Sequence, residues 1–293
     1  VGSEMCIRDR SNSLFEDNAE FGYGMLLAQQ AIRDGLKAKV EEVAANENAT
    51  AEVKAACQEW LDTFGVGATN GAATDKLVAA LENVDCPTCK DIVKNKDFLA
   101  KKSQWIFGGD GWAYDIGYGG VDHVLASGKD INIMVFDTEV YSNTGGQSSK
   151  ATKTGATAQF AAGGKETKKK DLAGMAMSYG YVYVAQIAMG ADFNQTVKAI
   201  TEAEAYPGPS LIIAYAPCIN HGIKKGMSKA QTEEQLAVEC GYWNNFRFNP
   251  GAEGDKFFLD SKEPKKEDYQ AFLDGEVRYN ALKRACLLYT SDA

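Results

Sequence analysis

The spacing of hydrophobic residues divides the chain near residue 104. Before that point, apolar residues recur three or four positions apart, which places them on one face of a helix. Two such faces carry Ile32, Leu36, Val40 and Val43, and Val53, Cys57, Trp60 and Leu61. The pattern predicts a helical section over residues 11–103 whose apolar faces pack into a core.

After residue 104, short apolar runs alternate with stretches of helical periodicity. Strands are expected over residues 104–108, 131–136, 181–187 and 210–215, helices over 171–179 and 194–205, short edge strands within 246–260 and a charged helix ending at 283. Such alternation is typical of a parallel sheet that is covered on both sides. We therefore predict an α/β fold over residues 104–285, with a doubly wound, mostly parallel sheet and helices on both faces.

Chemically distinctive residues follow three of the expected strands, namely Asp110, Thr138 and Cys218. The carboxyl ends of parallel strands meet at one edge of a sheet, where ligands of such folds bind. Asp110 and Thr138 are 28 positions apart, which is the length of one helical crossover between neighbouring strands. The spacing predicts that these two side chains lie close together.

Asp110 stands between Gly109 and Gly111. Magnesium prefers a few protein oxygens completed by phosphate and water oxygens, and Asp110 and Thr138 could supply the protein part. The glycines would let the backbone approach a diphosphate before the amino end of a helix. A dinucleotide site is disfavoured because Tyr114 stands where its fingerprint needs a third glycine. The residues predict a magnesium–diphosphate site.

Three longer motifs carry a family resemblance. They are GDGWAYDIGYGG at residues 109–120, DTEVYSNTGGQSS at 137–149 and APCINHG at 216–222. The chain resembles, over residues 11–285, the thiamine-diphosphate domain of the pyruvate:ferredoxin (flavodoxin) oxidoreductases. The resemblance implies the thiamine-diphosphate-binding fold and a fragment of a much larger enzyme.

The resemblance implies roles for individual residues. Magnesium would be held by Asp110, Thr138 and the backbone carbonyl of Val140, and Cys218 would be one of four thiolates of a [4Fe-4S] cluster. Asn143 would contact both the cofactor and the 2-oxoacid as a catalytic residue. The implied cofactor contacts are Gly109, Asp110, Gly111, Trp112, Thr138, Glu139, Val140, Tyr141, Ser142 and Asn143.

The resemblance also implies an activity. Such an enzyme converts pyruvate and coenzyme A to acetyl-CoA and carbon dioxide in anaerobic metabolism, passing electrons through iron–sulfur clusters to ferredoxin or flavodoxin. A homodimer is expected for the full-length protein, and the remaining domains of the enzyme are its partners. The isolated chain is expected to be inactive, because the glutamate that activates the cofactor would belong to another domain.

Two alternatives stay open. A non-redox thiamine enzyme, such as a decarboxylase or transketolase, would share the diphosphate site but would have no use for Cys218. An inactive binding module would have no metal-dependent affinity for the cofactor at all. Both alternatives can be distinguished from the oxidoreductase by experiment.

Composition limits the partners and the compartment. Asp and Glu number 40 against 31 Lys and Arg, for a formal charge of −9, which argues against a nucleic-acid partner. No apolar run reaches the ~18 residues of a membrane span. Seven scattered cysteines, an odd number, do not resemble a secreted disulfide framework. A cytoplasmic protein is expected. Residues 1–10 and 286–293 do not continue the resemblance and are expected to be a non-native leader and tail.

Three further features need an interpretation. The C-x2-C pair Cys86 and Cys89 suits zinc, an iron–sulfur centre or a redox dithiol, or is simply two thiols at a helix start, and a cluster shared with Cys218 is a rival assembly. His221, three residues after Cys218, could tune the [4Fe-4S] cluster or the substrate. Residues 165–170, with four lysines and one glutamate, are expected to form a solvated loop, or alternatively to meet acidic ferredoxin or coenzyme A phosphates.

Overall fold

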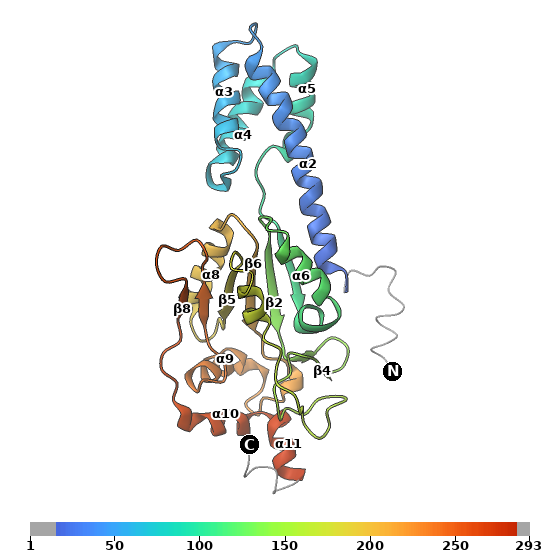
Figure 1. The fold of residues 1–293 in the computed structure, drawn as a ribbon, viewed down its shortest axis with the longest axis vertical. Coiled ribbons are helices and arrows are strands. Elements are labelled where there is room, and N and C mark those ends of the chain that lie inside the picture. Colours follow the sequence, from blue (N-terminus) through green and yellow to red (C-terminus); the bar gives the residue numbers. More distant parts are fainter. Residues whose placement is uncertain (1–15, 286–293) are drawn as a thin grey trace. The chain divides into compact units, whose positions relative to one another are not determined.

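The structure, a computed structural model, describes residues 16–285, so the predicted non-native ends lie outside the described residues. The chain divides into two compact units. The smaller unit is Tyr23–Gln104, and the larger one holds the described residues on either side of it (Figure 1). The long helix α2 (Asn18–Ala45) begins in the larger unit and continues into the smaller one.

The smaller unit is helical, as the apolar spacing predicts. Besides most of α2 it contains α3 (Ala51–Asp62), α4 (Gly67–Leu81), α5 (Pro87–Lys94) and the 3-10 turn η1 (Lys96–Phe98). Leu36, Val40 and Trp60 are buried in its core, whereas Ile32 is 39% exposed, so its assignment to the buried face is wrong. The guanidinium of Arg33 closes the unit by donating hydrogen bonds to backbone carbonyls and to a buried amide on three separate segments, at Phe64, Asn70 and Leu99.

The larger unit is built on a six-stranded sheet in the order β1-β2-β6-β5-β7-β8. The first four strands in this order are parallel, namely β1 (Trp105–Gly109), β2 (Asn132–Asp137), β6 (Ser210–Tyr215) and β5 (Tyr183–Ile187). The short strands β7 (Phe246–Phe248) and β8 (Phe257–Leu259) add antiparallel pairs at one edge. The prediction of a mostly parallel sheet is confirmed.

Both faces of the sheet are covered. On one face, α8 (Phe193–Ala205) packs Ala199 and Ala203 against Met134 and Ile212. Leu211, which points to the opposite face because side chains alternate along a strand, is also fully buried. Helix α6 (Tyr118–Ala126) follows β1 along the chain. Helix α7 (Leu172–Met177) precedes β5 and contacts both β5 and β6. The fold is therefore a doubly wound α/β fold, as predicted.

Several short elements lie beyond the carboxyl ends of the parallel strands (Figure 1). The pattern of apolar residues did not predict the turn of π-helix or the small antiparallel hairpin, because both are too short for a hydrophobic period. The elements are η2 (Gly111–Ile116), β3 (Val140–Tyr141), β4 (Gln147–Ser148), η3 (Ile219–His221), η4 (Met227–Lys229), α9 (Ala230–Glu239), η5 (Lys266–Asp268), α10 (Tyr269–Gly275) and α11 (Val277–Ala285).

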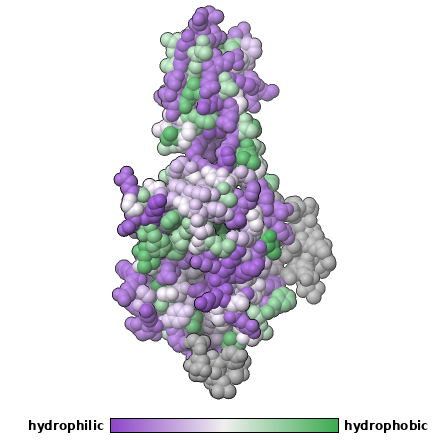
Figure 2. All heavy atoms as spheres, viewed as in Figure 1, coloured by the Kyte–Doolittle hydropathy of each residue, from purple (hydrophilic) through white to green (hydrophobic). Residues whose placement is uncertain are grey.

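The edge strand β8 leaves apolar side chains in contact with solvent. Phe257 is 49% exposed and Leu259 is 62% exposed. Figure 2 shows hydrophobic residues gathered on the side of the molecule where β8 lies. Within residues 16–285, no helix has both the length and the apolar character that crossing a bilayer requires.

Candidate active site

The neighbouring strands β1 and β2 bring Asp110 and Thr138 together. Gly109 lies beside Phe136 in the parallel register, so the residues that follow the two strands leave the sheet at the same edge. The Thr138 hydroxyl lies 2.7 Å from Asp110 Oδ1, and the Thr138 N–H donates to the same oxygen over 3.1 Å. The predicted proximity of the two side chains is observed.

A third predicted ligand joins this pair. The carbonyl oxygen of Val140 lies 2.9 Å from Thr138 Oγ1. A threonine hydroxyl has one proton, so it cannot donate to Val140 and to Asp110 at the same time. Magnesium–oxygen bonds of about 2.1 Å put adjacent oxygens of an octahedron about 3.0 Å apart. We call Asp110 Oδ1, Thr138 Oγ1 and Val140 O the oxygen cluster; its two separations of 2.7 and 2.9 Å are close to that spacing.

The Asp110 carboxylate is almost completely buried, at 1% exposure. Its second oxygen accepts a hydrogen bond of 2.7 Å from the hydroxyl of Ser149, a residue that the sequence placed in a motif but not in the site. Burial, followed by the charge of Asp137, raises the pKa of Asp110 to about 7. A carboxylate held in this way would gain from a cation, because a bound positive charge offsets the cost of burying its negative charge.

The glycines around Asp110 have different roles. A side chain at Gly111 would meet the ring of Tyr141, since an added Cβ would lie 2.4 Å from it. Gly109 instead faces open space, with no atom within 4 Å of an added Cβ. Gly111 is therefore needed so that the backbone can pack against Tyr141, whereas the space for a ligand lies beside Gly109. Trp112 is buried at 1% exposure, and its indole N–H has no hydrogen-bond partner.

The β3–β4 hairpin carries the other predicted contacts. Tyr141 and Ser142 are half-buried, and Asn143 is exposed in the turn. The turn is followed by Gly146, which has a left-handed φ of +80°, and an added Cβ there would lie 2.7 Å from Asn220 Oδ1. The hairpin therefore packs closely against the loop that carries Cys218.

A buried cluster of charged side chains lies at the end of β2. We call it the ion cluster and define it as Asp137, Glu139, Lys169, Glu276 and Arg278. The Lys169 ammonium bridges Asp137 at 2.6 Å and Glu139 at 3.0 Å. The expectation of a solvated loop over residues 165–170 is therefore wrong for Lys169, whose side chain is 17% exposed. A run of lysines gives no signal that one of them turns inward to pair with two carboxylates.

Two lysines of the same run also hold nearby segments, so the loop is not a free solvated segment. Lys165 donates to the Ser149 carbonyl over 3.1 Å, and Lys170 donates to the Tyr114 carbonyl over 3.0 Å. By contrast, Lys168 is exposed.

The Glu139 side chain points into the ion cluster, away from the oxygen cluster. Its backbone has a left-handed φ of 58°, and its carboxylate pairs with Arg278 at 2.8 Å. Burial alone would raise the pKa of Glu139, but Lys169 and then Arg278 outweigh that effect and lower it. The guanidinium of Arg278 also donates to Glu276 over 2.7 Å. Glu139 and Glu276 thus share one cation on α11.

His221 links the Cys218 loop to the loop that carries Thr138. Its Nε2 lies 2.7 Å from the carbonyl oxygen of Thr138, and because a carbonyl only accepts, Nε2 carries the proton. Burial, followed by the charge of Arg278, lowers the pKa of His221 to about 3, so the ring is neutral. The sequence allows His221 a role at the [4Fe-4S] cluster or the substrate; its contact in the structure is with the backbone next to the oxygen cluster.

Cys218 ends the loop after β6 and is half-buried. The N–H and the side-chain amide of Asn220 approach its sulfur at 3.5 and 3.4 Å. In the part of the chain that the structure describes, no three His, Cys, Asp or Glu side chains are grouped to hold a metal ion. The oxygen cluster has a single carboxylate and so is not a group of this kind, and in the described residues Cys218 is not joined by further side chains to form a complete metal site.

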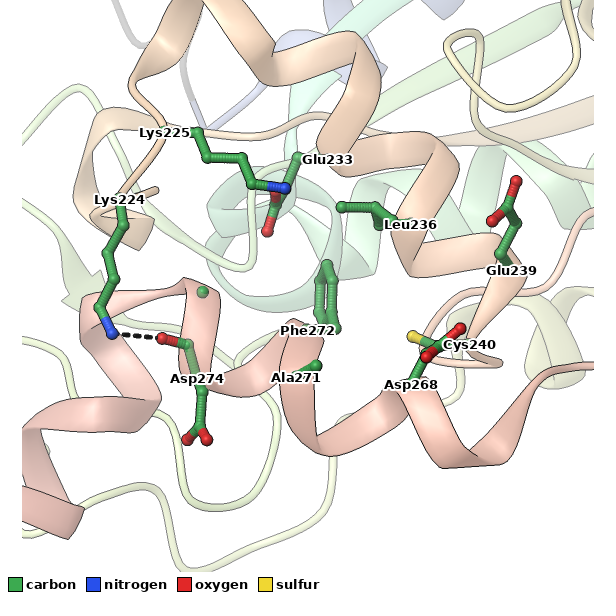
Figure 3. Close-up of a pocket in the computed structure, with 11 residues that line it drawn as sticks. Lys224, Lys225, Glu233, Leu236, Glu239, Cys240, Asp268, Ala271, Phe272 and Asp274 are labelled. Carbon is green, nitrogen blue, oxygen red and sulfur yellow. Dashed lines mark hydrogen bonds between the residues drawn. The ribbon is translucent and has the colours of Figure 1, made fainter.

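A separate cavity of about 570 Å³ lies between α9 and α10 (Figure 3). Its lining mixes apolar side chains, such as Leu236 and Phe272, with charged ones, such as Lys225 and Asp268. None of the predicted site residues lines it. The cavity is therefore distinct from the oxygen cluster.

Comparison with known proteins agrees with the diphosphate-binding α/β fold that the sequence predicts. Residues 93–214 match the family described as thiamine pyrophosphate enzyme, C-terminal TPP binding domain. The matched segment runs from the end of α5 to β6 and contains the whole oxygen cluster. Residues 93–214 are accordingly similar to a domain of the thiamine pyrophosphate enzyme class.

The chain is also similar to particular enzymes. The chain is 59% identical to the pyruvate-flavodoxin oxidoreductase of Enterobacter agglomerans and 55% identical to the pyruvate:ferredoxin oxidoreductase of Moorella thermoacetica, with 94% of this chain and 24% of each relative covered. It is 48% identical to the mitochondrial pyruvate dehydrogenase [NADP(+)] of Euglena gracilis, over 93% of this chain and 15% of that protein.

These matches confirm the family resemblance carried by the three motifs. The chain corresponds to one segment of the pyruvate-flavodoxin and pyruvate:ferredoxin oxidoreductases. It spans about a quarter of the length of the curated relatives it matches.

Proposed function

We propose that the oxygen cluster binds magnesium and, through it, the diphosphate of thiamine diphosphate. The observation that carries this proposal is the separation of 2.7 and 2.9 Å from Thr138 Oγ1 to Asp110 and Val140. The three oxygens come from the ends of two neighbouring strands, and a single buried carboxylate supplies the charge. Open space at Gly109 leaves room for the phosphates beside them.

The residues of the chain would mainly hold and orient the cofactor. When bound, thiamine diphosphate supplies the carbanion-stabilising chemistry of the reaction. Asp110, Thr138 and Val140 would fix the metal, while Asn143, exposed in the hairpin turn, is free to reach a ligand above the strand ends. Trp112 and Glu139 have buried side chains, so their proposed cofactor contacts would come from the backbone.

We further propose that the chain is part of a 2-oxoacid:ferredoxin or flavodoxin oxidoreductase that acts on pyruvate with coenzyme A. The support is its similarity to proteins with these names over 94% of its length. One relative is named pyruvate dehydrogenase [NADP(+)], so NADP⁺ is the main alternative electron acceptor to test. A non-redox decarboxylase or transketolase, and an inactive binding module, receive no support from these relatives.

Cys218 is proposed as one ligand of a [4Fe-4S] cluster. Such a cluster usually needs four thiolates, so three others must come from outside the described segment or from another part of the enzyme. The loop of Cys218 packs against the hairpin of Asn143, which would put an electron acceptor next to the cofactor site. We also infer a homodimeric full-length enzyme, a cytoplasmic location and a role in anaerobic metabolism.

Calorimetric titration of the chain with thiamine diphosphate tests the first proposal. Heat of binding is expected with magnesium and is expected to disappear when the metal is chelated. Binding that is equally strong with and without magnesium would contradict a metal-mediated diphosphate site. The absence of any binding at millimolar cofactor would favour the inactive module.

A chimaera tests the proposed enzyme. Residues 16–285 would replace the matching segment of the Moorella thermoacetica protein, and pyruvate-dependent reduction of ferredoxin and of NADP⁺ would be measured. Activity with ferredoxin that a Cys218→Ser change abolishes would support the proposed cluster ligand. Retained electron transfer in the Cys218→Ser chimaera would contradict it.

A further inference from the structure

The proposed function leaves the C-x2-C pair of the helical unit unexplained. Cys86 is the N-cap of α5, Pro87 is its first residue and Cys89 is its third. An N-cap side chain lies against the third helical residue, which is why capping side chains bond the N–H at that position. The helix start therefore puts Cys86 and Cys89 at the two positions of the first turn whose side chains can approach each other.

The two thiols have unequal surroundings. Cys89 is 2% exposed and packs in the core of the helical unit, whereas Cys86 is half-buried at its rim. The Cys86 sulfur makes no capping hydrogen bond of normal geometry, but the N–H of Cys89, followed by the Cys89 thiol, still lowers the pKa of Cys86. Burial, followed by the Cys86 thiol, raises the pKa of Cys89 to about 12.

This asymmetry separates an attacking sulfur from a resolving one. A thiolate and not a thiol attacks a disulfide, and C-x2-C pairs at helix starts are favourable places for one. We propose that Cys86 and Cys89 form a reversible thiol–disulfide exchange site, in which Cys86 attacks and Cys89 resolves. The site would take a small disulfide, such as oxidised glutathione, as its oxidant.

The exchange is balanced in two steps. The Cys86 thiolate attacks one sulfur of the oxidant, the disulfide of the oxidant breaks, and its first thiolate leaves and takes up a proton. Cys89 then loses its proton to solvent, its sulfur attacks the Cys86 sulfur, and the second thiolate leaves and takes up a proton, which balances the one that Cys86 lost when it ionised. One disulfide is consumed and one is formed, so two cysteine thiols are oxidised and two glutathione thiols are released.

Two other assignments of the pair fit less well. In the described part of the chain no third His, Cys, Asp or Glu side chain joins the pair to hold a metal ion. Cys57 packs in the same core but is completely buried, and burial raises the pKa of Cys57 to about 11, so it is a poor first nucleophile. The pair also lies in a different unit from the oxygen cluster, so its test does not depend on thiamine diphosphate.

The test uses the full chain, purified with reduced thiols and equilibrated with oxidised and reduced glutathione. Peptide mass spectrometry after alkylation would locate each disulfide. A Cys86–Cys89 disulfide that returns to two thiols with excess reduced glutathione is expected. In Cys89→Ser, a glutathione adduct should accumulate at Cys86, at least about tenfold more than at Cys89 in Cys86→Ser.

Matched controls keep the result interpretable. Cys57→Ala and Cys240→Ser remove buried thiols outside the pair and should leave the exchange unchanged, and circular dichroism checks that every variant is folded. No Cys86–Cys89 disulfide, a disulfide with Cys57 instead, or faster adduct formation at Cys89 would each overturn the proposal. So would stoichiometric zinc that the wild-type chain retains and Cys86→Ser loses.

Discussion

His221 donates a hydrogen bond of 2.7 Å to the carbonyl oxygen of Thr138. The two residues are 83 positions apart, and each follows a different strand of the sheet. The same Thr138 carries a hydroxyl of the oxygen cluster on its side chain. His221 therefore fixes, through the backbone, the loop that would hold the metal.

Replacing His221 should weaken both stability and cofactor affinity. His221→Phe keeps a ring of similar size but leaves the Thr138 carbonyl without a donor, which we expect to cost about 1–3 kcal/mol of unfolding free energy. His221→Gln retains an N–H donor and should recover part of this loss. Urea unfolding measures the first effect, and titration with thiamine diphosphate and magnesium measures the second. Equal affinity in His221→Phe and the wild type would contradict the positioning role.

The hydroxyl of Thr138 should matter more than its methyl group. Thr138→Val removes an oxygen of the proposed magnesium site at nearly constant volume, and we expect at least about tenfold weaker magnesium-dependent binding. Thr138→Ser keeps the hydroxyl and serves as the matched comparison. Thr201→Val, on the exposed surface of α8, is a control for loss of a threonine hydroxyl elsewhere. Equal binding by Thr138→Val and Thr138→Ser would exclude Thr138 as a ligand.

Lys169 should be essential for stability although it lies in a lysine-rich run. Lys169→Met leaves the buried carboxylates of Asp137 and Glu139 without their shared cation, and breaking such a buried pair costs about 3–5 kcal/mol. Lys168→Met, at an exposed neighbouring position, should change the unfolding free energy by less than about 0.5 kcal/mol. Chemical denaturation of the two variants gives the comparison. Similar stabilities would mean that the ion cluster contributes little.

Glu276 should make stability depend on pH. Burial raises the pKa of Glu276 to about 7, although Arg278 opposes the shift. The folded protein therefore keeps a proton on Glu276 that the unfolded chain loses near pH 4.5, so the contribution of Glu276 to stability is fully present below that pH and is lost as pH rises to 7. The full effect is at most about 3 kcal/mol. Glu276→Gln should remove this downward contribution between pH 4.5 and 7 and leave the contributions of Asp110 and His221 in place. An unchanged slope would contradict the assignment.

Hydrophobic spacing predicted the elements that are long enough to have a period. The four parallel strands, helix α8 and the helical unit follow from it, and the length of one crossover was enough to place Asp110 beside Thr138. In the helical unit, the prediction that Ile32 is buried was wrong, because the spacing of apolar residues does not show how wide the buried face of a helix is.

The parts of the site that were missed depend on contacts between distant segments. Ser149 reaches Asp110 across 39 positions, and Arg278 reaches Glu139 from the last described helix. A lysine in a charged run and an arginine near the end of the chain have no local pattern that separates them from surface residues. Their partners become visible only when the sheet brings its strand ends together.

The direction of side chains alternates along Asp137, Thr138 and Glu139, so a three-residue segment serves two neighbouring chemistries. Thr138 faces the oxygen cluster, while the residues on either side of it enter the ion cluster. Variants at 137 and 139 would then be lost mainly through misfolding, whereas variants at 138 could remain soluble and simply lose the cofactor. Selection for a stable fold would therefore act on positions 137 and 139, whereas selection for cofactor binding would act on position 138 between them.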